Sequence, residues 1–365
     1  MFTLGRRELL ASALLGAASK LRAAEDRKLG IPGPYPGRVV AVSHSGSIAG
    51  RQYNREAVRA MLRKGMMELT GAPSWQDAWR VFFQKGDVVG LKLNPVGRPH
   101  VISAPEVVQE IIACLREAGV EARDIIAYDR YKREFLDAGF DKWLPQGVRW
   151  MAATDQTHPL QLDMDGYDGD QYVELPLLLP KANPSDRHHR RSYLAKFITK
   201  DINKMINLCL LKHHQSAGIT LALKNMSHGL VNNVSRSHVS ASNNSCNTFI
   251  PAIVDHPIIR QKVVLNITDA VLAAYHGGPG RKVEKYVWAH KTMYFSTDPV
   301  AMDRIGWKVL DEKRTEMGMK PLATALMDDD SRFIRMQPEH VEIAGLLGLG
   351  EADMARIDYR QFTLA

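Results

Sequence analysis

Short apolar runs alternate with amphipathic stretches along the first part of the chain. Apolar runs of strand length occur at residues 38–44, 86–95 and 122–130. Residues 54–71 and 104–119 lie between them and carry apolar positions at intervals of three and four, the period of a helix. Gly71 marks the expected end of the first helix. This alternation predicts an α/β fold, with a mostly parallel sheet and helices on both faces.

The second part of the chain resumes this pattern after a polar region. Residues 150–200 are rich in turn-forming and charged residues, which predicts a polar insertion or lid rather than a second domain. The core then continues with a buried strand at 200–214, strands at 261–271 and 291–298, helices at 298–314 and 338–351, and an edge strand at 356–365. Asp298 followed by Pro299 is typical of a helix start. We therefore expect a single α/β domain over residues 25–365.

Residues 1–24 have the layout of a twin-arginine export signal. Arg6 and Arg7 precede an apolar run at residues 9–18. That run is shorter than the about 20 residues that a membrane-spanning helix needs. An amphipathic N-terminal helix is the alternative. Export by the twin-arginine machinery would make the protein periplasmic or otherwise exported, and no later stretch is apolar enough to be an integral membrane segment in the mature chain.

Composition narrows the classes of partner. The 365 residues are 45% hydrophobic and 24% charged, as is usual for a soluble globular protein. Lys and Arg exceed Asp and Glu by eight, without the clustered runs that mark nucleic-acid binders. A small anionic molecule is therefore a better partner than nucleic acid. Cys114, Cys209 and Cys246 are too widely spaced for an iron–sulfur motif, so no self-contained iron–sulfur cluster is expected.

Basic and amide side chains follow two of the predicted strands. Lys92 and Asn94 end one apolar run, and Lys212 and His214 end another. Ligands bind at the carboxyl ends of parallel strands in sheets of this kind. His213, next to His214 on the strand, should point to the opposite face.

A polar stripe is expected just after the second of these strands. Gly218 permits a tight turn, and residues 219–229 are predicted to form a helix closed by a glycine. Thr220, Lys224 and His228 are spaced by four and would share one face of that helix.

Buried lysines require a negative partner, because an uncompensated buried charge costs several kcal/mol. The partner can be a carboxylate or phosphate ligand, or a carboxylate of the protein in a structural network, such as Asp129, Asp269 or Asp298. The residues expected to bind an anion are Lys92, Asn94, Lys212, Thr220, Lys224 and Asn225.

His214 and His238 are the candidate catalytic residues, because imidazole can exchange protons near neutral pH. Together with a carboxylate such as Asp269 at a strand end, they could also hold a divalent metal. No motif spacing requires a metal, so the cofactor stays open.

In order along the chain, these residues resemble the uncharacterised-domain family 362 (DUF362). The matching elements are Lys92 and Asn94; Lys212 and His214; Thr220, Lys224 and Asn225; His238; Asp269 and Ala270; Gly277 to Pro279; and Ser296 to Asp303. They cover most of residues 85–310. His213 stands where the family usually has threonine, and the ferredoxin-like segment of some members is missing. The resemblance implies no particular reaction.

Three functions are compatible with this site. The first is an exported enzyme that acts on an anionic small molecule, with Lys92, Lys212 and Lys224 as charge clamps and His214 or His238 as acid, base or metal ligand. The second is a periplasmic anion-binding module without chemistry. The third is a structural protein in which the polar cluster is a buried salt-bridge network.

Overall fold

A computed structural model describes residues 28–155, 160–180, 182–240, 243–279, 281–325 and 333–365. The predicted export signal therefore lies outside the described residues. Within the described part, no helix is both long and apolar enough to cross a membrane.

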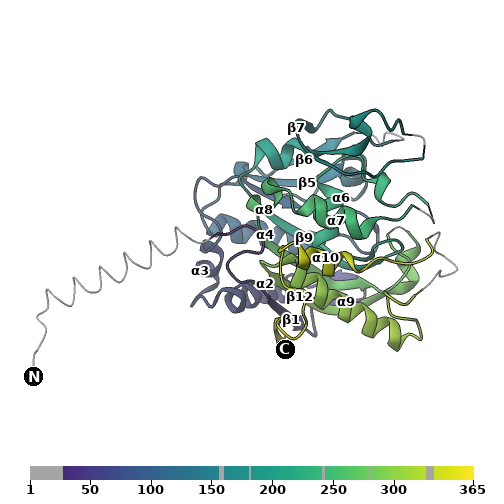
Figure 1. Ribbon diagram of the computed structural model, residues 1–365. Coiled ribbons are helices and arrows are strands. Elements are labelled where there is room, and N and C mark those ends of the chain that lie inside the picture. The colour runs from purple at the N-terminus through teal and green to yellow at the C-terminus, as the bar shows by residue number, and fades with distance from the viewer. Residues whose placement is uncertain (1–27, 156–159, 181, 241–242, 280, 326–332) are drawn as a thin grey trace, which may run out of the picture.

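One large sheet runs through the molecule, in the strand order β13-β1-β12-β11-β9-β4-β5-β6 (Figure 1). Its strands are β1 (Arg38–His44), β4 (Val89–Lys92), β5 (Ile125–Tyr131), β6 (Arg149–Thr154), β9 (Lys204–His214), β11 (Val263–Ala274), β12 (Val287–Ser296) and β13 (Asp358–Leu364). The stretch from β11 to β6 is parallel throughout, whereas β12 runs antiparallel to both of its neighbours. The predicted α/β class and the mostly parallel sheet are confirmed.

Helices cover both faces of this sheet, as expected (Figure 1). One face carries α2 (Arg55–Thr70), α3 (Trp75–Arg80) and α4 (Pro105–Glu117), whose apolar sides pack with the sheet into one core. The other face carries α6 (Ala222–Gly229), α7 (Cys246–Val254), α8 (Pro257–Lys262), α9 (Pro299–Glu316) and α10 (His340–Leu346), which share a second core. The short α5 (Lys132–Asp137) follows β5.

Local signals explain where the long helices begin and end. The side chain of Asn54 accepts hydrogen bonds from Glu56 N and Ala57 N at the start of α2, and Gly71 ends that helix in the left-handed conformation with φ 72°. Asp298 caps α9 in the same way, by accepting from Val300 N and Ala301 N. Both predicted helix boundaries are confirmed.

The polar region at residues 150–200 is more regular than its composition indicated. Its first segment forms β6 at the edge of the main sheet, and β7 (Tyr167–Glu174) pairs with β8 (Arg191–Ala195) as a separate antiparallel hairpin. The buried guanidinium of Arg236 donates to the carbonyl oxygens of Leu175 and Leu177 beside this hairpin. The insertion is thereby attached to the main domain.

The segment expected to be a helix from residue 219 begins as a strand. Residues Gly218–Thr220 form β10, which pairs antiparallel with the end of β9, so that Thr220 lies opposite Lys212. Gly218 makes this reversal possible with φ 77°, a left-handed value that favours glycine. The helix α6 begins only at Ala222, and the single-helix stripe of Thr220, Lys224 and His228 is therefore wrong.

Candidate functional site

A cavity of about 370 Å³ opens at the carboxyl ends of β4, β5 and β9. All the residues predicted to bind an anion or to catalyse line it: Lys92, Asn94, Lys212, His214, Thr220, Lys224, Asn225 and His238. A volume of this size suits a small-molecule ligand. Parallel pairing explains the convergence, because Lys92 on β4 is level with Asn207 on β9 and Tyr128 on β5.

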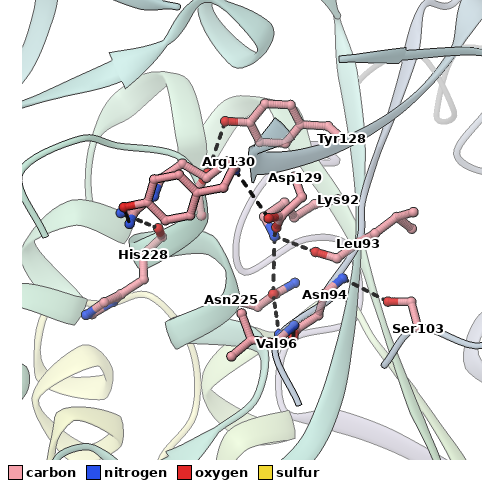
Figure 2. Close-up of polar contacts among 12 residues, drawn as sticks. Lys92, Leu93, Asn94, Val96, Ser103, Tyr128, Asp129, Arg130, Asn225 and His228 are labelled. Carbon is pink, nitrogen blue, oxygen red and sulfur yellow. Dashed lines mark hydrogen bonds and ion pairs between the residues drawn. The ribbon is translucent and has the colours of Figure 1, made fainter. Parts of the chain in front are cut away.

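Lys92 forms a buried ion pair. Its Nζ lies 2.7 Å from Asp129 Oδ1, and both side chains are almost completely buried. It also donates to the carbonyl oxygen of Leu93 and to Asn225 Oδ1, as Figure 2 shows. The charge of Lys92 is thus neutralised within the protein, which corresponds to the structural alternative for this one lysine.

A relay of amides orients the polar wall between Lys92 and Lys212. Lys212 Nζ donates to Asn94 Oδ1 at 3.0 Å, and Asn94 Nδ2 donates to Asn225 Oδ1 at 3.0 Å. Asn225 Nδ2 in turn donates to Asn207 Oδ1 at 2.7 Å. Because an ammonium group can only donate, it sets the direction of every amide in this series. Asn94 and Asn225 therefore have fixed orientations in the cavity wall.

Lys212 and Lys224 have no carboxylate partner among the described residues. Lys212 donates to Asn94 and to the carbonyl oxygen of Val96, whereas no hydrogen bond from Lys224 Nζ occurs within the described part of the chain. Burial first, and then the charge of Lys224, lower the pKa of Lys212 from 10.5 to about 7. Burial also lowers the pKa of Lys224 to about 8. Two destabilised ammonium groups therefore face one cavity.

Thr220 adds an unsatisfied hydroxyl group to this part of the wall. Its side chain is 5% exposed, and Oγ1 has no hydrogen-bond partner in the described structure. Buried hydroxyl groups are normally bonded, so this hydroxyl is available to a ligand or to water in the cavity. Its position opposite Lys212 in the β9–β10 pair directs both groups toward the same space.

His214 enters the cavity as a hydrogen-bond donor. Its Nδ1 accepts from the backbone N–H groups of Ser216, at 3.2 Å, and Ala217, at 3.3 Å. Backbone N–H groups can only donate, so the neutral ring carries its proton on Nε2. Burial and the nearby Lys224 hold the pKa of His214 well below 6.5, which favours this neutral form. His213, as predicted, lies apart from the cavity and contacts Met336.

His238 lies beside a second group of potential ligands. One ligand atom each from His228, His238 and Cys246 lies within 4.8 Å of those of the other two. Ser237 Oγ is 2.6 Å from His238 Nδ1 and 3.2 Å from His228 Nε2. These residues come from the end of α6, from the turn that follows it and from the start of α7. Because they stand on separate elements, no local spacing in the sequence predicts that they lie close together.

Asp269 does not join the histidines with which it was expected to bind a metal. The strand β11 continues to Ala274, so Asp269 lies in mid-strand rather than at a strand end. Side chains alternate along a strand, and Asp269 points to the face beneath α2 and α4, where it accepts from Tyr53 Oη at 3.1 Å and Ala104 N at 3.3 Å. Burial raises the pKa of its carboxyl group to about 7.

Three charged residues of the cavity were missing from the predicted anion-binding and catalytic set: Arg130, Glu134 and Asp129, the last described above as the partner of Lys92. Arg130 donates to the carbonyl oxygens of His228 and Val231 at the end of α6. Glu134 lines the wall beyond β5, and burial raises its pKa. Arg130 stood at a predicted strand end, which was a usable signal, whereas Glu134 enters only through the short helix after β5.

Comparison with known proteins identifies a family but no activity. A crystal structure of a protein from Thermotoga maritima, a Northeast Structural Genomics Consortium target, is similar at 11% identity and a TM-score of 0.39, over 62% of this chain and 52% of the other. This chain thus spans about half of that protein, and the likeness is too weak to carry an argument. No curated protein matches the chain. The family model for DUF362, a domain of unknown function, matches residues 89–308, more than half of the chain, and the protein therefore belongs to the DUF362 family.

Proposed function

We propose that the protein is an exported enzyme that binds and transforms a small anionic molecule, a carboxylate or a phosphate, in this cavity. The observation that carries the proposal is the pairing of Lys212 and Lys224, two buried ammonium groups without a carboxylate partner in the described chain, beside the orphan hydroxyl of Thr220. An anion would compensate both charges and accept from the hydroxyl group.

The wall has the groups that a reaction on such an anion requires. Lys224 and Thr220 would hold the negative group, and His214 Nε2–H would donate to an oxygen on which charge develops. Lys212 would exchange a proton close to neutral pH, because burial lowers its pKa to about 7. His238 is the further candidate for proton transfer, and its ring lies 5.5 Å from that of His214. Lys212 and His214 both line this cavity, so a proton donor and a proton-exchanging group are available to one bound molecule.

The rigidity of the wall supports the same proposal. Lys92, which is paired with Asp129, donates to Asn225, and Lys212 donates to Asn94. The two amide groups are therefore oriented before a ligand arrives. Groups that are positioned in advance need little reorganisation during a reaction.

The proposed export rests on Arg6 and Arg7 and the short apolar run after them. Twin-arginine export would deliver the protein already folded. A reporter fused behind residues 1–27 should reach the periplasm, and replacement of both arginines by lysine should retain it in the cytoplasm. A reporter that stays inside with the natural sequence would contradict export and favour the N-terminal amphipathic helix.

The enzymatic proposal is tested by binding followed by turnover. Inorganic phosphate and a series of small carboxylates are titrated by calorimetry into the full chain and into Lys212→Met, with the exposed Lys308→Met on α9 as the control for loss of one charge. We expect Lys212→Met to weaken binding by about 1.5–3 kcal/mol, the scale of a charge-assisted hydrogen bond, and Lys308→Met to leave it unchanged. Binding without conversion of any bound compound would favour the anion-binding module. Absence of binding to every probe would refute the clamp.

A further inference from the structure

We infer that His228, His238 and Cys246 form a binding site for a thiophilic divalent ion, with Zn²⁺ as the expected occupant, on the wall of the cavity. The inference is independent of the proposed anion clamp. It makes His238 a metal ligand instead of a proton-transfer group, so that Lys212 remains the proton-exchanging residue of the cavity. One ligand atom of each residue lies within 4.8 Å of those of the other two. A tetrahedral zinc site with bonds of about 2.0–2.3 Å separates its ligand atoms by roughly 3.5 Å. Side-chain movements of about 1 Å would therefore close the three residues around an ion.

A hydroxyl group accompanies each of the three residues. Ser227 Oγ lies 3.0 Å from His228 Nδ1, and Ser237 Oγ lies 2.6 Å from His238 Nδ1. Metal-bound histidines almost always use their second ring nitrogen for such a bond, which fixes the ring and its tautomer. Ligation through the two Nε2 atoms would keep both of these bonds, and an ion would displace the contact of 3.2 Å between His228 Nε2 and Ser237 Oγ.

Cys246 has a comparable neighbour. Its Sγ lies 3.4 Å from Ser216 Oγ, and the side chain is completely buried at the start of α7. A sulfur ligand with two imidazoles selects zinc or a softer ion over Mg²⁺ or Ca²⁺, which prefer oxygen. The other two cysteines, Cys114 and Cys209, lie in the apolar cores, and no histidine of the described residues is hydrogen-bonded to either.

The arrangement of the three residues leaves one coordination position open. His228 and His238 line the cavity, whereas Cys246 lies behind them. Three protein ligands with a fourth position on the cavity side are typical of a catalytic rather than a structural zinc site. His214 cannot complete the set, because its Nδ1 accepts two backbone N–H groups and its Nε2 carries the proton. The ion would lie one turn along α6 from Lys224, so an anion in the cavity could contact both.

Metal binding by the full chain tests this inference directly. The protein is produced without a histidine tag, stripped with a chelator and titrated with Zn²⁺, and the metal content is measured by mass spectrometry. We expect one Zn²⁺ for each chain. Co²⁺ in its place should give a thiolate-to-cobalt charge-transfer band in the near ultraviolet. The band reports directly on a Cys ligand and needs no variant, so its absence from the natural protein would overturn the inference.

Matched variants identify the ligands. Cys246→Ser should remove the charge-transfer band and weaken Zn²⁺ binding by on the order of 100-fold or more, whereas Cys114→Ser should leave both unchanged. Ser237→Ala should keep the band and weaken binding about 10- to 100-fold, the usual effect of removing an outer partner of a ligand. A band that survives Cys246→Ser would place the ion elsewhere and refute the site. Lys224→Met should lose the anion but keep the metal, so failure of the clamp and failure of the metal site give different results.

Discussion

Replacing Lys224 by methionine in the ligand-free protein distinguishes a ligand clamp from a structural ion pair. Burial lowers the pKa of Lys224 from 10.5 to about 8. At about 1.4 kcal/mol for each tenfold change in proton affinity, a protonated Lys224 destabilises the folded protein by roughly 3 kcal/mol at pH 7. Methionine keeps the apolar stem and removes the charge. We therefore expect the free energy of unfolding to change by less than about 1 kcal/mol or to rise by up to ~3 kcal/mol.

Lys92 provides the matched control for this substitution. It lies in the same cavity wall and is also buried, but its ammonium group pairs with Asp129 at 2.7 Å. Lys92→Met would leave that carboxylate buried and unpaired, and should lower the free energy of unfolding by about 3–5 kcal/mol. The same change at two lysines of one cavity should thus lower stability strongly at Lys92 and leave it unchanged or raised at Lys224.

Urea unfolding at pH 7, followed by tryptophan fluorescence, measures both variants. Stability is compared from the midpoint and the slope, because a changed slope would indicate a change in the denatured ensemble. A loss above about 3 kcal/mol for Lys224→Met, on the scale of a broken buried pair, would show that this lysine is a structural partner. The clamp would then be abandoned.

Three further predictions concern the same cavity. Anion affinity should be constant below pH 7 and fall about tenfold from pH 7 to pH 8, because Lys212, whose pKa is about 7, must take up a proton on binding. The fall should be steeper above pH 8, where Lys224 also loses its proton. Calorimetry in buffers of different ionisation enthalpy measures the uptake, and its absence at pH 8 would contradict the assignment of Lys212. Thr220→Val should stabilise the ligand-free protein by about 1 kcal/mol, because it removes an unsatisfied hydroxyl group. The same substitution should weaken anion binding about tenfold, and an unchanged affinity would exclude the hydroxyl as a ligand group. Gly229→Ala should lower the free energy of unfolding by about 1–3 kcal/mol. The added Cβ would lie 2.1 Å from Lys92 Cε and would displace Lys92 from its ion pair with Asp129. A melting curve like that of the natural protein would show that the lysine can move aside.

The sequence predicted the site where local patterns determine it. Apolar runs located the strands, and Lys92, Asn94, Lys212 and His214 follow from their carboxyl ends. The hydrophobic pattern failed where strand pairing determines the secondary structure. Residues 218–220 form a hairpin strand because they can bond to the end of β9, and a period of four cannot reveal that. Asp269 was misplaced because nothing in a strand's composition marks where it ends.

Interactions between distant segments were beyond any local pattern. The ion pair of Lys92 with Asp129 joins residues 37 positions apart, and the sequence offered Asp269 and Asp298 as equally good partners. The packing of α7 against α6 brings Cys246 to His228 across 17 intervening residues. In both cases the chemistry depends on which of several polar groups the core places within reach, and this choice is made by packing.

The helix α6 explains how one short element can serve both proposed sites. At its start, the Asp303 carboxylate accepts from Ala222 N at 2.7 Å and from Leu223 N at 3.1 Å. At its end, Arg130 donates to the carbonyl oxygen of His228 at 3.1 Å (Figure 2). A carboxylate at the amino end and a guanidinium at the carboxyl end both complement the helix dipole. An eight-residue helix has little stability of its own, so these contacts and its packing determine its position.

Lys224 and His228 are therefore held in place by groups that do not themselves contact a ligand. Asp303 comes from α9 and Arg130 from the end of β5, so the two ends of the helix are fixed by separate elements. The charge on Lys224 destabilises the fold, yet the surrounding contacts orient the helix that carries it into the cavity rather than toward solvent. This arrangement is consistent with the proposed anionic ligand, since an apolar residue at this position would give a more stable ligand-free protein.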